Sequence, residues 1–352
     1  MAMLNWFNNI FSSDIGIDLG TSNTLIYVKG QGIVLSEPSM VAVNQKTGRV
    51  VAVGTDAKLM VGRTPAHIEA ISPLTGSVIS NFEVAEEMLS YFIKRAGDAA
   101  KKRLLRPRVV VSVPTGITNV ERRAVRDAIK NAGAREVHIV EVPMAAALGI
   151  RLPVHDPVGS MIIDIGGGTT DIAVVSLGGI VKSKILPIAG DKLNADIMSY
   201  VRDEFKILLG EKTAEDVKIQ IGSVQKDGPP KEATIRGRDL VTGLPREVII
   251  TDADIREAIT HSISILIDSI KEVLESTPPE VVSDVMRRGI VLVGGGSLIS
   301  GLPELLEREL EMPIHLEEEP KTAVIRGAGV ILEDLIRYSE ILIDNEDELP
   351  PR

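Results

Sequence analysis

Cysteine is absent from this chain of 352 residues. Disulfide bonds, thiolate nucleophiles and Cys-ligated zinc sites are therefore excluded. Basic residues are too few for a typical nucleic-acid-binding protein, because 39 Lys and Arg stand against 49 Asp and Glu and give a formal net charge of −10. No stretch approaches the roughly 18 consecutive apolar residues of a membrane span. Neither a basic segment nor a small-residue cleavage site accompanies the apolar N-terminus, so the sequence predicts a cytoplasmic protein without a nucleic-acid partner.

Aromatic residues are also scarce, at 3%, so the core must be built from Val, Ile, Leu and Ala. The apolar fraction of 44% and the charged fraction of 25% are ordinary for a soluble globular protein. At roughly 100–200 residues per domain, the length predicts two or three domains.

Hydrophobic periodicity and turn residues predict the main elements. The expected strands are 15–19, 24–28, 33–35, 40–43, 50–53, 108–113, 137–142 and 288–293, and the expected helices are 84–100, 191–209, 252–275, 303–311 and 322–336. Thr118 and Glu121 form a capping box that opens one more helix, whose expected apolar stripe is Val120, Ala124, Ala128 and Ala132. Between 212 and 247 the chain is more polar, and short β runs are expected there.

An internal repeat carries most of the functional information. Two segments, Asp18-Leu19-Gly20-Thr21-Ser22-Asn23-Thr24 and Asp164-Ile165-Gly166-Gly167-Gly168-Thr169-Thr170, each place an Asp at the end of an apolar strand and follow it with a Gly- and hydroxyl-rich hairpin. Small residues let backbone N–H groups close on a phosphate, because a Cβ would keep the anion away. Each Asp can hold a hydrated Mg²⁺, which takes one or two carboxylates. Two such hairpins facing each other would hold a nucleoside triphosphate from both sides.

A third turn, Gly294-Gly295-Gly296-Ser297, also follows an apolar strand and precedes a helix. It suits the close approach of a base, a sugar or an α-phosphate. One glycine-rich turn alone would be an ordinary tight turn, but three turns with matched Asp positions favour a nucleotide site. The Gly-Lys-Ser/Thr of a Walker A loop and the Rossmann fingerprint are both missing.

The order of motifs DLGTSNT, VPMAAALG, DIGGGTTD and GGGSLISGLPELL resembles the actin, sugar-kinase and heat-shock-chaperone ATPase superfamily. Within it, GDKLNADIMSYVR and STPPEVVSDVMRRGIVLVGGGSLISGL resemble the MreB family of bacterial actins, and the likeness runs from about residue 14 to 333. The resemblance implies an α/β, actin-like (ribonuclease H-like) fold with two domains and four subdomains around a nucleotide cleft. The implied domains are an N-terminal helix (1–13), domain I (14–154 plus 324–352, small subdomain 42–74) and domain II (155–323, small subdomain 191–252).

The resemblance also implies roles for the residues of these motifs. Asp18 and Asp164 would position Mg²⁺, and Thr169 would orient the attacking water. Phosphates would be held by Gly20, Thr21, Ser22, Asn23, Gly166, Gly167, Gly168 and Thr169. The nucleoside would be bordered by Glu211, Lys212, Thr213, Ala214, Gly294, Gly295, Gly296 and Ser297. The implied cofactors are ATP and Mg²⁺.

One departure from the family pattern concerns catalysis. The family usually has a Glu directly before the Pro of the Pro-Met-Ala-Ala-Ala segment, where it activates the water. Here that position is Val142, and Glu141 precedes it. Neighbouring side chains of a strand point to opposite faces, so Glu141 would point away from the γ-phosphate unless the strand is bulged. The sequence therefore predicts ATP binding with at most a weak ATPase, Glu141 being the alternative catalytic base.

Two segments predict attachment to a membrane. Met3, Leu4, Phe7, Ile10 and Phe11 fall on one face of a helix, with Trp6 at its boundary. Leu104 and Leu105 stand among five basic residues between 101 and 108, an arrangement that suits insertion among anionic head groups. The alternatives are a helix docked on the protein's own surface and a solvated run of charge.

The resemblance implies self-association into filaments, with the helix 120–132 as a possible pairing surface. The predicted function is a membrane-associated bacterial actin that organises cell-wall synthesis and sets rod shape, together with membrane proteins of the elongation machinery. A small-metabolite kinase of the same fold would need a catalytic Asp in a substrate pocket and insertions that are not evident. A chaperone-type ATPase would need a substrate-binding domain after the nucleotide domain, and the sequence leaves no room for one.

Overall fold

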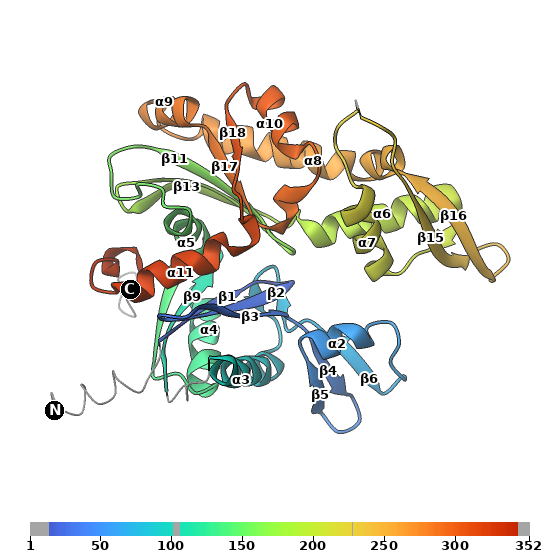
Figure 1. Cartoon of the computed structure of the whole chain (residues 1–352), viewed down its shortest axis with the longest axis horizontal. Coiled ribbons are helices and arrows are strands. Elements are labelled where there is room, and N and C mark those ends of the chain that lie inside the picture. Colours follow the sequence, from blue (N-terminus) through green and yellow to red (C-terminus); the bar gives the residue numbers. More distant parts are fainter. Residues whose placement is uncertain (1–13, 101–105, 227, 344–352) are drawn as a thin grey trace, which may run out of the picture. The chain divides into compact units, whose positions relative to one another are not determined.

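The computed structural model describes residues 14–100, 106–226 and 228–343 (Figure 1). The chain forms two compact units. Of the described residues, unit 1 contains those up to Val158, the segment Val175–Ile180 and those from Thr322 onward, whereas unit 2 contains those in Gly159–Val174 and Val181–Lys321. Each unit is an α/β body with its own five-stranded sheet.

The sheet of unit 1 has the order β10-β9-β1-β2-β3. Its strands are β1 (Ile15–Leu19), β2 (Asn23–Val28), β3 (Gly32–Pro38), β9 (Arg108–Val113) and β10 (Glu136–Glu141). The first three form an antiparallel meander, as expected, while β9 and β10 are parallel to β1. Parallel pairing aligns Asp18 with Ser112 and Ser112 with Val140, so these three side chains share one face of the sheet.

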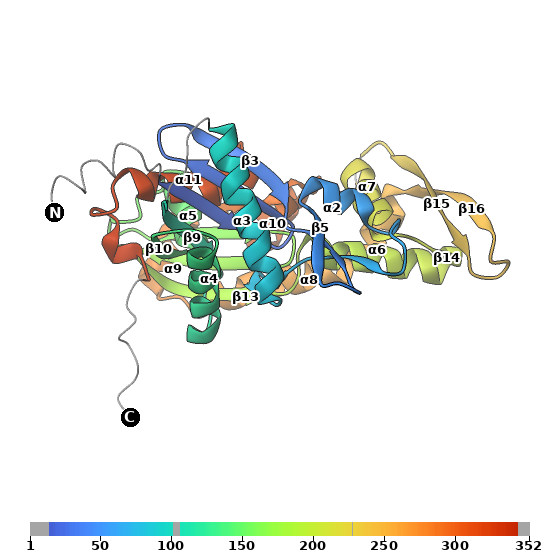
Figure 2. The same ribbon diagram turned by 90° about the horizontal axis from the view of Figure 1, so that it is seen from below.

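The two faces of this sheet are covered by different helices (Figures 1 and 2). Ile17, Val111 and Ile139 share a buried cluster with side chains of α3 (Phe82–Ala99) and α4 (Asn119–Asn131). Gly16, on the other face, lies against α11 (Ala323–Glu333), where a Cβ would be 3.1 Å from that of Ala328. Asp18, one of the expected metal ligands, therefore faces the α11 side of the sheet.

Helices α5 (Val142–Gly149) and α11 cross at very short range. A Cβ on Gly149 would stand 1.9 Å from the carbonyl oxygen of Ala323, and a Cβ on Gly327 would stand 1.7 Å from that of Ala145. No side chain can be accommodated at such distances, so glycine is required at both positions. This crossing fixes the segment that begins directly after Glu141.

A smaller part of unit 1 is built on the three-stranded sheet β5-β4-β6. It comprises β4 (Val41–Asn44), β5 (Arg49–Val53), α2 (Thr55–Met60) and β6 (Ile68–Ile71), and the hairpin of β7 (Leu74–Thr75) and β8 (Val78–Ile79) follows it. Glu37 connects this part to α3, because its carboxylate accepts hydrogen bonds from Thr55 N at 2.8 Å and from Arg95 Nη1 at 2.8 Å.

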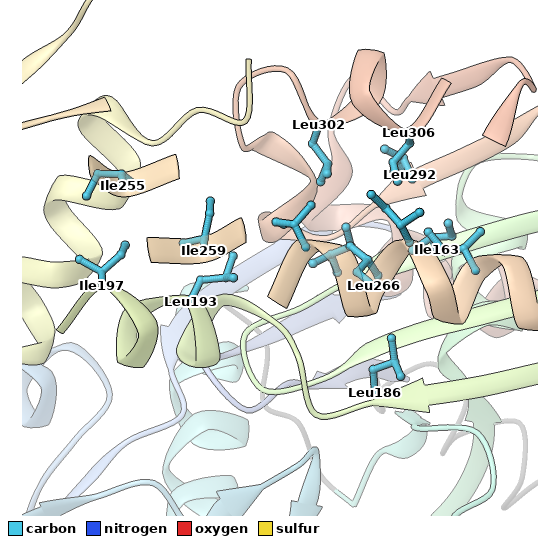
Figure 3. Packing of buried hydrophobic residues seen from close by; sticks show 14 of the residues in the cluster. Ile163, Leu186, Leu193, Ile197, Ile255, Ile259, Leu266, Leu292, Leu302 and Leu306 are labelled. Carbon is cyan, nitrogen blue, oxygen red and sulfur yellow. The ribbon is translucent and has the colours of Figure 1, made fainter. Parts of the chain in front are cut away.

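The sheet of unit 2 has the order β13-β12-β11-β17-β18. Its strands are β11 (Ser160–Ile165), β12 (Thr170–Ser176), β13 (Gly179–Leu186), β17 (Ile290–Val293) and β18 (Ile314–Leu316). Ile163, Leu266 and Leu306 belong to one continuous core that joins this sheet to α8 (Asp252–Glu275) and α10 (Leu302–Leu310), as Figure 3 shows.

The rest of unit 2 comprises α6 (Gly190–Phe205), α7 (Glu211–Ile221), α9 (Pro279–Arg288) and the sheet of β14 (Ile207–Leu208), β15 (Glu232–Asp239) and β16 (Pro245–Thr251). Ile197 and Ile255 extend the same core between α6 and α8 (Figure 3). No helix among the described residues is both long and apolar enough to cross a bilayer.

The structure corrects several expectations about local structure. The helix expected over 191–209 ends at Phe205, because Lys206 adopts a left-handed conformation with φ 57° and leads into β14. The polar stretch expected to hold short β runs begins instead with helix α7. Pro279 does not merely stop the preceding helix, since it also opens α9, where its missing N–H costs nothing.

Helix α4 begins with the expected capping box, but its buried face differs from the expected stripe. Val125, Ala128 and Ile129 are buried, whereas Val120 is 79% exposed. Val120 stands in the first turn of α4, beyond the edge of the core. The prediction from helical spacing, which put Val120 on the buried face, was therefore wrong.

Candidate functional site

The first Gly-rich loop, Gly20 to Asn23, is held through its carbonyl oxygens. Ser39 Oγ donates to Gly20 O at 2.6 Å, and Ser39 N donates to Ser22 O at 3.0 Å. Ser72 Oγ donates to the intervening carbonyl, Thr21 O, at 3.4 Å. All three carbonyl groups are thus directed toward serine donors of unit 1.

The loop's N–H groups follow from this arrangement. In a trans peptide the N–H points opposite to the preceding C=O. The N–H groups of Thr21, Ser22 and Asn23 therefore face away from the serines that hold the carbonyls. A Cβ on Gly20 would stand 2.7 Å from Asn23 O, so only glycine fits the closed turn. A row of outward N–H groups on a tight backbone is the arrangement that binds phosphate.

The side chain of Thr21 is engaged as well. Its Oγ1 accepts a hydrogen bond from Ser77 N at 3.0 Å and lies 3.2 Å from Ser77 Oγ. Ser77 belongs to the β7–β8 turn and has a φ of 61°. The hydroxyl of Thr21 thus holds the β7–β8 turn. The phosphate donors that the loop offers are its backbone N–H groups.

Asp18 stands one residue before the end of β1, and only Leu19 separates it from this loop. Ser112 Oγ donates to its Oδ1 at 2.8 Å, which lowers the pKa of the carboxyl, but burial outweighs this and raises the pKa to about 6. Burial disfavours the charged form unless a cation compensates it. A carboxylate destabilised in this way fits a metal ligand, because a bound Mg²⁺ would supply the missing positive charge.

The second loop, Gly166 to Thr169, repeats the design in unit 2. Gly166 N donates to Thr169 O at 2.9 Å and closes the turn. The first turn of α6 holds the carbonyls, since Gly190 N donates to Gly166 O at 3.2 Å and Asp191 N donates to Gly167 O at 2.8 Å. By the trans-peptide argument, the N–H groups of Gly167 and Gly168 face away from α6. Both loops therefore offer backbone donors, although different partners hold them.

Thr169, the residue expected to orient the attacking water, is buried at 8% exposure. Its Oγ1 lies 3.5 Å from Asp171 Oδ2. The side chain is thus placed at the loop by a neighbour on β12.

The third Gly-rich turn is in contact with the end of β11, directly before the second loop. Parallel pairing of β11 and β17 places Asp164 beside Val293. Gly294 has a φ of 82°, and a Cβ there would stand 2.3 Å from Asp164 Oδ1. The side chain of Ser297 is buried and donates to Gly294 O at 2.6 Å, so it closes the turn and is not directed to a ligand. The structure thus brings together two motifs that are 130 positions apart in the chain.

The expected nucleoside-binding residues Glu211 to Ala214 form the first turn of α7. Glu211 and Lys212 are exposed, Thr213 is partly exposed, and Ala214 is buried in the core. The segment after α7 is bonded to the segment that follows the third turn, because Val224 N donates to Ser300 O at 2.9 Å.

Lys218 of α7 is a candidate site residue that the sequence analysis missed. Its Nζ donates to Gly190 O at 2.8 Å, and Gly190 N in turn holds Gly166 O. The lysine thus brings a positive charge beside the second loop. The helix that carries Lys218 could have been predicted from the helical spacing of the apolar residues Ala214, Val217 and Ile221. The many polar residues of α7 concealed this pattern.

Glu141 ends β10 and faces away from Asp18. It pairs with Val113, one position after the aligned Ser112 and Val140, so its side chain lies on the opposite face of the sheet. Burial raises the pKa of the Glu141 carboxyl, while a hydrogen bond from Gly116 N–H and the charge of Arg122 on α4 lower it. The strand contains no bulge here, and Val142 already belongs to α5.

The expected membrane residues, Met3, Leu4, Trp6, Phe7, Ile10, Phe11, Leu104 and Leu105, lie outside the described residues. Within the described part of the chain, no group of three or more His, Asp or Glu could hold a metal ion by itself.

Comparison with known proteins gives a consistent result. The model of the MreB/Mbl protein family matches residues 12–340. Cell shape-determining protein Mbl of Bacillus subtilis is 46% identical over 97% of this chain and 99% of its own, and cell shape-determining protein MreB of Escherichia coli is 47% identical over 98% and 100%.

Solved structures agree with this. MreB5 of Spiroplasma citri bound to ADP has a TM-score of 0.88 and 39% identity, covering 92% of this chain and 97% of its own. The same protein bound to AMPPNP has a TM-score of 0.88 and 38% identity, covering 94% and 98%. The predicted actin-like fold is therefore confirmed, and the chain belongs to the MreB/Mbl family.

Proposed function

We propose that this chain is an ATP-binding bacterial actin that polymerises on the inner face of the cytoplasmic membrane, organises cell-wall synthesis and sets rod shape. The observation that carries the proposal is the repeated loop. In each unit the carbonyl groups of this loop accept hydrogen bonds from the protein, so its N–H groups point the other way and remain available beside an aspartate. Near-full-length similarity to MreB5 bound to AMPPNP, and to relatives named for cell shape, supports it.

The nucleotide would be held by backbone donors of both loops. Gly20 to Asn23 and Gly166 to Thr169 would bind the phosphates, and Asp18 and Asp164 would position a Mg²⁺ that offsets their charge. Glu211, Lys212, Thr213, Ala214 and the turn Gly294 to Ser297 would border the nucleoside, with Ser297 contributing through its backbone alone. We add Lys218 to this set, since its ammonium group lies beside Gly190 and the second loop.

Nucleotide binding would act as the switch for assembly. A ligand shifts a conformational equilibrium only by binding one state more tightly than the other. A triphosphate would therefore favour the arrangement of the two units in which both loops can contact it. Successive copies would then add head to tail, a heterologous contact that does not close and so gives filaments. Exposed Val120 on α4 is a candidate contact between paired filaments, and Val120→Glu should leave single filaments in electron micrographs.

Attachment to the membrane would use the N-terminal segment and the basic segment 101–108, which contains Leu104 and Leu105. Each is weak alone, but polymerisation multiplies weak anchors. Co-sedimentation with anionic vesicles should be lost on deleting residues 1–11 together with Leu104→Ser and Leu105→Ser. Equal pelleting of this variant and the native chain, without filaments present, would remove the membrane from the proposal. Membrane proteins of the elongation machinery would then be recruited to the attached filament.

The decisive experiment is calorimetry with purified protein, using ATP and AMPPNP with and without Mg²⁺, followed by light scattering with anionic vesicles. Magnesium-dependent binding and ATP-dependent scattering are the expected results. Absence of magnesium-dependent binding would overturn the proposal, and phosphorylation of a sugar in a parallel assay would point to a kinase instead.

A further inference from the structure

Helix α4 carries an unusual charge for this acidic protein. It contains four basic residues, Arg122, Arg123, Arg126 and Lys130, and two acidic ones, Glu121 and Asp127. Glu121 is occupied by the capping box, where Thr118 Oγ1 and Thr118 N donate to its Oε2 at 2.6 Å and 2.9 Å. The helix therefore presents a net positive surface on a chain with a formal net charge of −10.

Three of these cations form a stripe along the edge strand β10. Arg122, Arg126 and Lys130 recur at intervals of four residues, which places them on one side of the helix. Arg122 acts on the carboxylate of Glu141, at one end of β10. Its buried Nε has no hydrogen-bond partner among the described residues. Lys130, at the other end of the stripe, is exposed.

The described chain ends against the middle of this stripe. Ile343 N donates to Ile139 O of β10 at 2.8 Å, and Arg126 Nη2 donates to Ile343 O at 3.5 Å. The next five residues in the sequence are Asp344, Asn345, Glu346, Asp347 and Glu348, of which four are acidic. The acidic segment thus begins at the arginine in the centre of the basic stripe.

We propose that the acidic segment 344–348 binds the basic stripe Arg122, Arg126 and Lys130 of its own chain. Eight residues of helix span about 12 Å at 1.5 Å per residue. Five extended residues span about 16 Å. The segment is therefore long enough to reach either end of the stripe from Ile343. Because the segment starts at Arg126, it can follow the stripe toward Arg122 or toward Lys130, where its acidic side chains would meet a guanidinium or an ammonium group.

The chain's own segment is favoured over other anionic partners by its attachment. Its first residue, Asp344, directly follows Ile343, whose carbonyl oxygen accepts a hydrogen bond from Arg126. Binding is therefore intramolecular, and short tethers give effective concentrations in the millimolar range. The contact would screen α4 from anionic surfaces and would cover part of the open edge of β10.

Zero-length carbodiimide coupling, read by mass spectrometry on the full, nucleotide-free chain, tests this contact. The method joins carboxylates only to amines in direct contact, and Lys130 supplies such an amine. Arg122→Lys supplies a second amine at the other end of the stripe. Lys94, which is exposed on α3 of the same unit, is the matched control.

At 0.1 M salt we expect links from residues 344–348 to Lys130, or to the amine introduced at 122, at least tenfold more often than to Lys94. Coupling should fall several-fold at 1 M salt, where the Debye length drops from about 10 Å to about 3 Å. Equal coupling at all three amines, or links only between differently labelled molecules, would overturn the proposal. Since no nucleotide or filament is involved, this result is independent of the proposed function.

Discussion

Asp18 and Glu141 lie on opposite faces of the sheet in unit 1, although both stand near the carboxyl ends of strands in one parallel set. The alignment of Asp18 with Ser112 and of Glu141 with Val113 leaves no ambiguity about this. A general base must come within hydrogen-bond reach of the water that it activates. If the triphosphate binds on the Asp18 side, Glu141 is badly placed for that role.

Phosphate release should therefore be slow in the native chain and faster in Val142→Glu. A positioned general base typically contributes about 10²–10⁴-fold, and a gain of tenfold or more is expected here. Single-turnover phosphate release measures it, with Glu141→Ala as the companion variant. Fast release in the native chain that drops in Glu141→Ala would identify Glu141 as the base.

Nucleotide binding should weaken at mildly acid pH, because burial raises the pKa of Asp18 to about 6. The charged form that binds Mg²⁺ is lost as pH falls through that value, whereas an ordinary aspartate would stay charged to about pH 4. Titration of Mg²⁺-dependent AMPPNP affinity from pH 8 to pH 5 measures the effect. An affinity unchanged down to pH 5 would contradict it.

The same raised pKa makes Asp18 a source of instability without a ligand. Above the unfolded-state pKa the unfolded chain binds fewer protons than the folded one, so the charged carboxyl disfavours folding at neutral pH. Asp18→Asn should raise the free energy of unfolding by about 1–2 kcal/mol at pH 7.5, a value reduced for partial exposure of the side chain. Urea unfolding should show the gain shrinking as pH falls below 6 and vanishing below about 4.

The third turn offers a matched pair of variants. Gly294→Ala forces a Cβ to within 2.3 Å of Asp164 Oδ1 at a φ of 82°, whereas Gly295→Ala meets nothing closer than 3.8 Å. Gly294→Ala should lower nucleotide affinity at least tenfold, and Gly295→Ala, in the same proposed site but without this clash, should lower it much less. Calorimetry measures both, and circular dichroism checks that both variants fold. Equal affinities would show that the turn does not position Asp164.

Gly327→Ala should destabilise unit 1 strongly, because its Cβ would stand 1.7 Å from Ala145 O. Overpacking typically lowers the free energy of unfolding by about 1–3 kcal/mol, and a clash with the backbone at this distance should lower it by about 3 kcal/mol or more. Gly179→Ala is the control, since its nearest contact is at 3.9 Å, and it should change stability by less than about 0.5 kcal/mol. Chemical denaturation decides between them.

Features determined by adjacent residues were predictable from the sequence. The capping box at Thr118 and Glu121 and the full extent of α8 are examples, because caps and helical periodicity are local. The two Asp–Gly hairpins also occur where expected, since each depends on a single strand and its turn.

Features that depend on distant pairing were not predictable. Contact between Asp164 and Gly294 arises from the alignment of β11 with β17, which no local pattern encodes. Lys218 was missed because its helix is mostly polar, and its bond to Gly190 O joins α7 to α6. Val120 is apolar yet exposed, because tertiary packing and not helical spacing decides which side of α4 is covered.

The crossing of α5 and α11 has a consequence for biosynthesis. Residues 142–149 leave the ribosome long before residues 323–333. Until α11 has been synthesised, the residues of α5 that it covers in the folded protein have no helix to pack against. Domains generally fold as units during synthesis. Unit 2 lies wholly between these two helices in the sequence, so it can finish folding first, and the unit whose synthesis begins first completes its fold last.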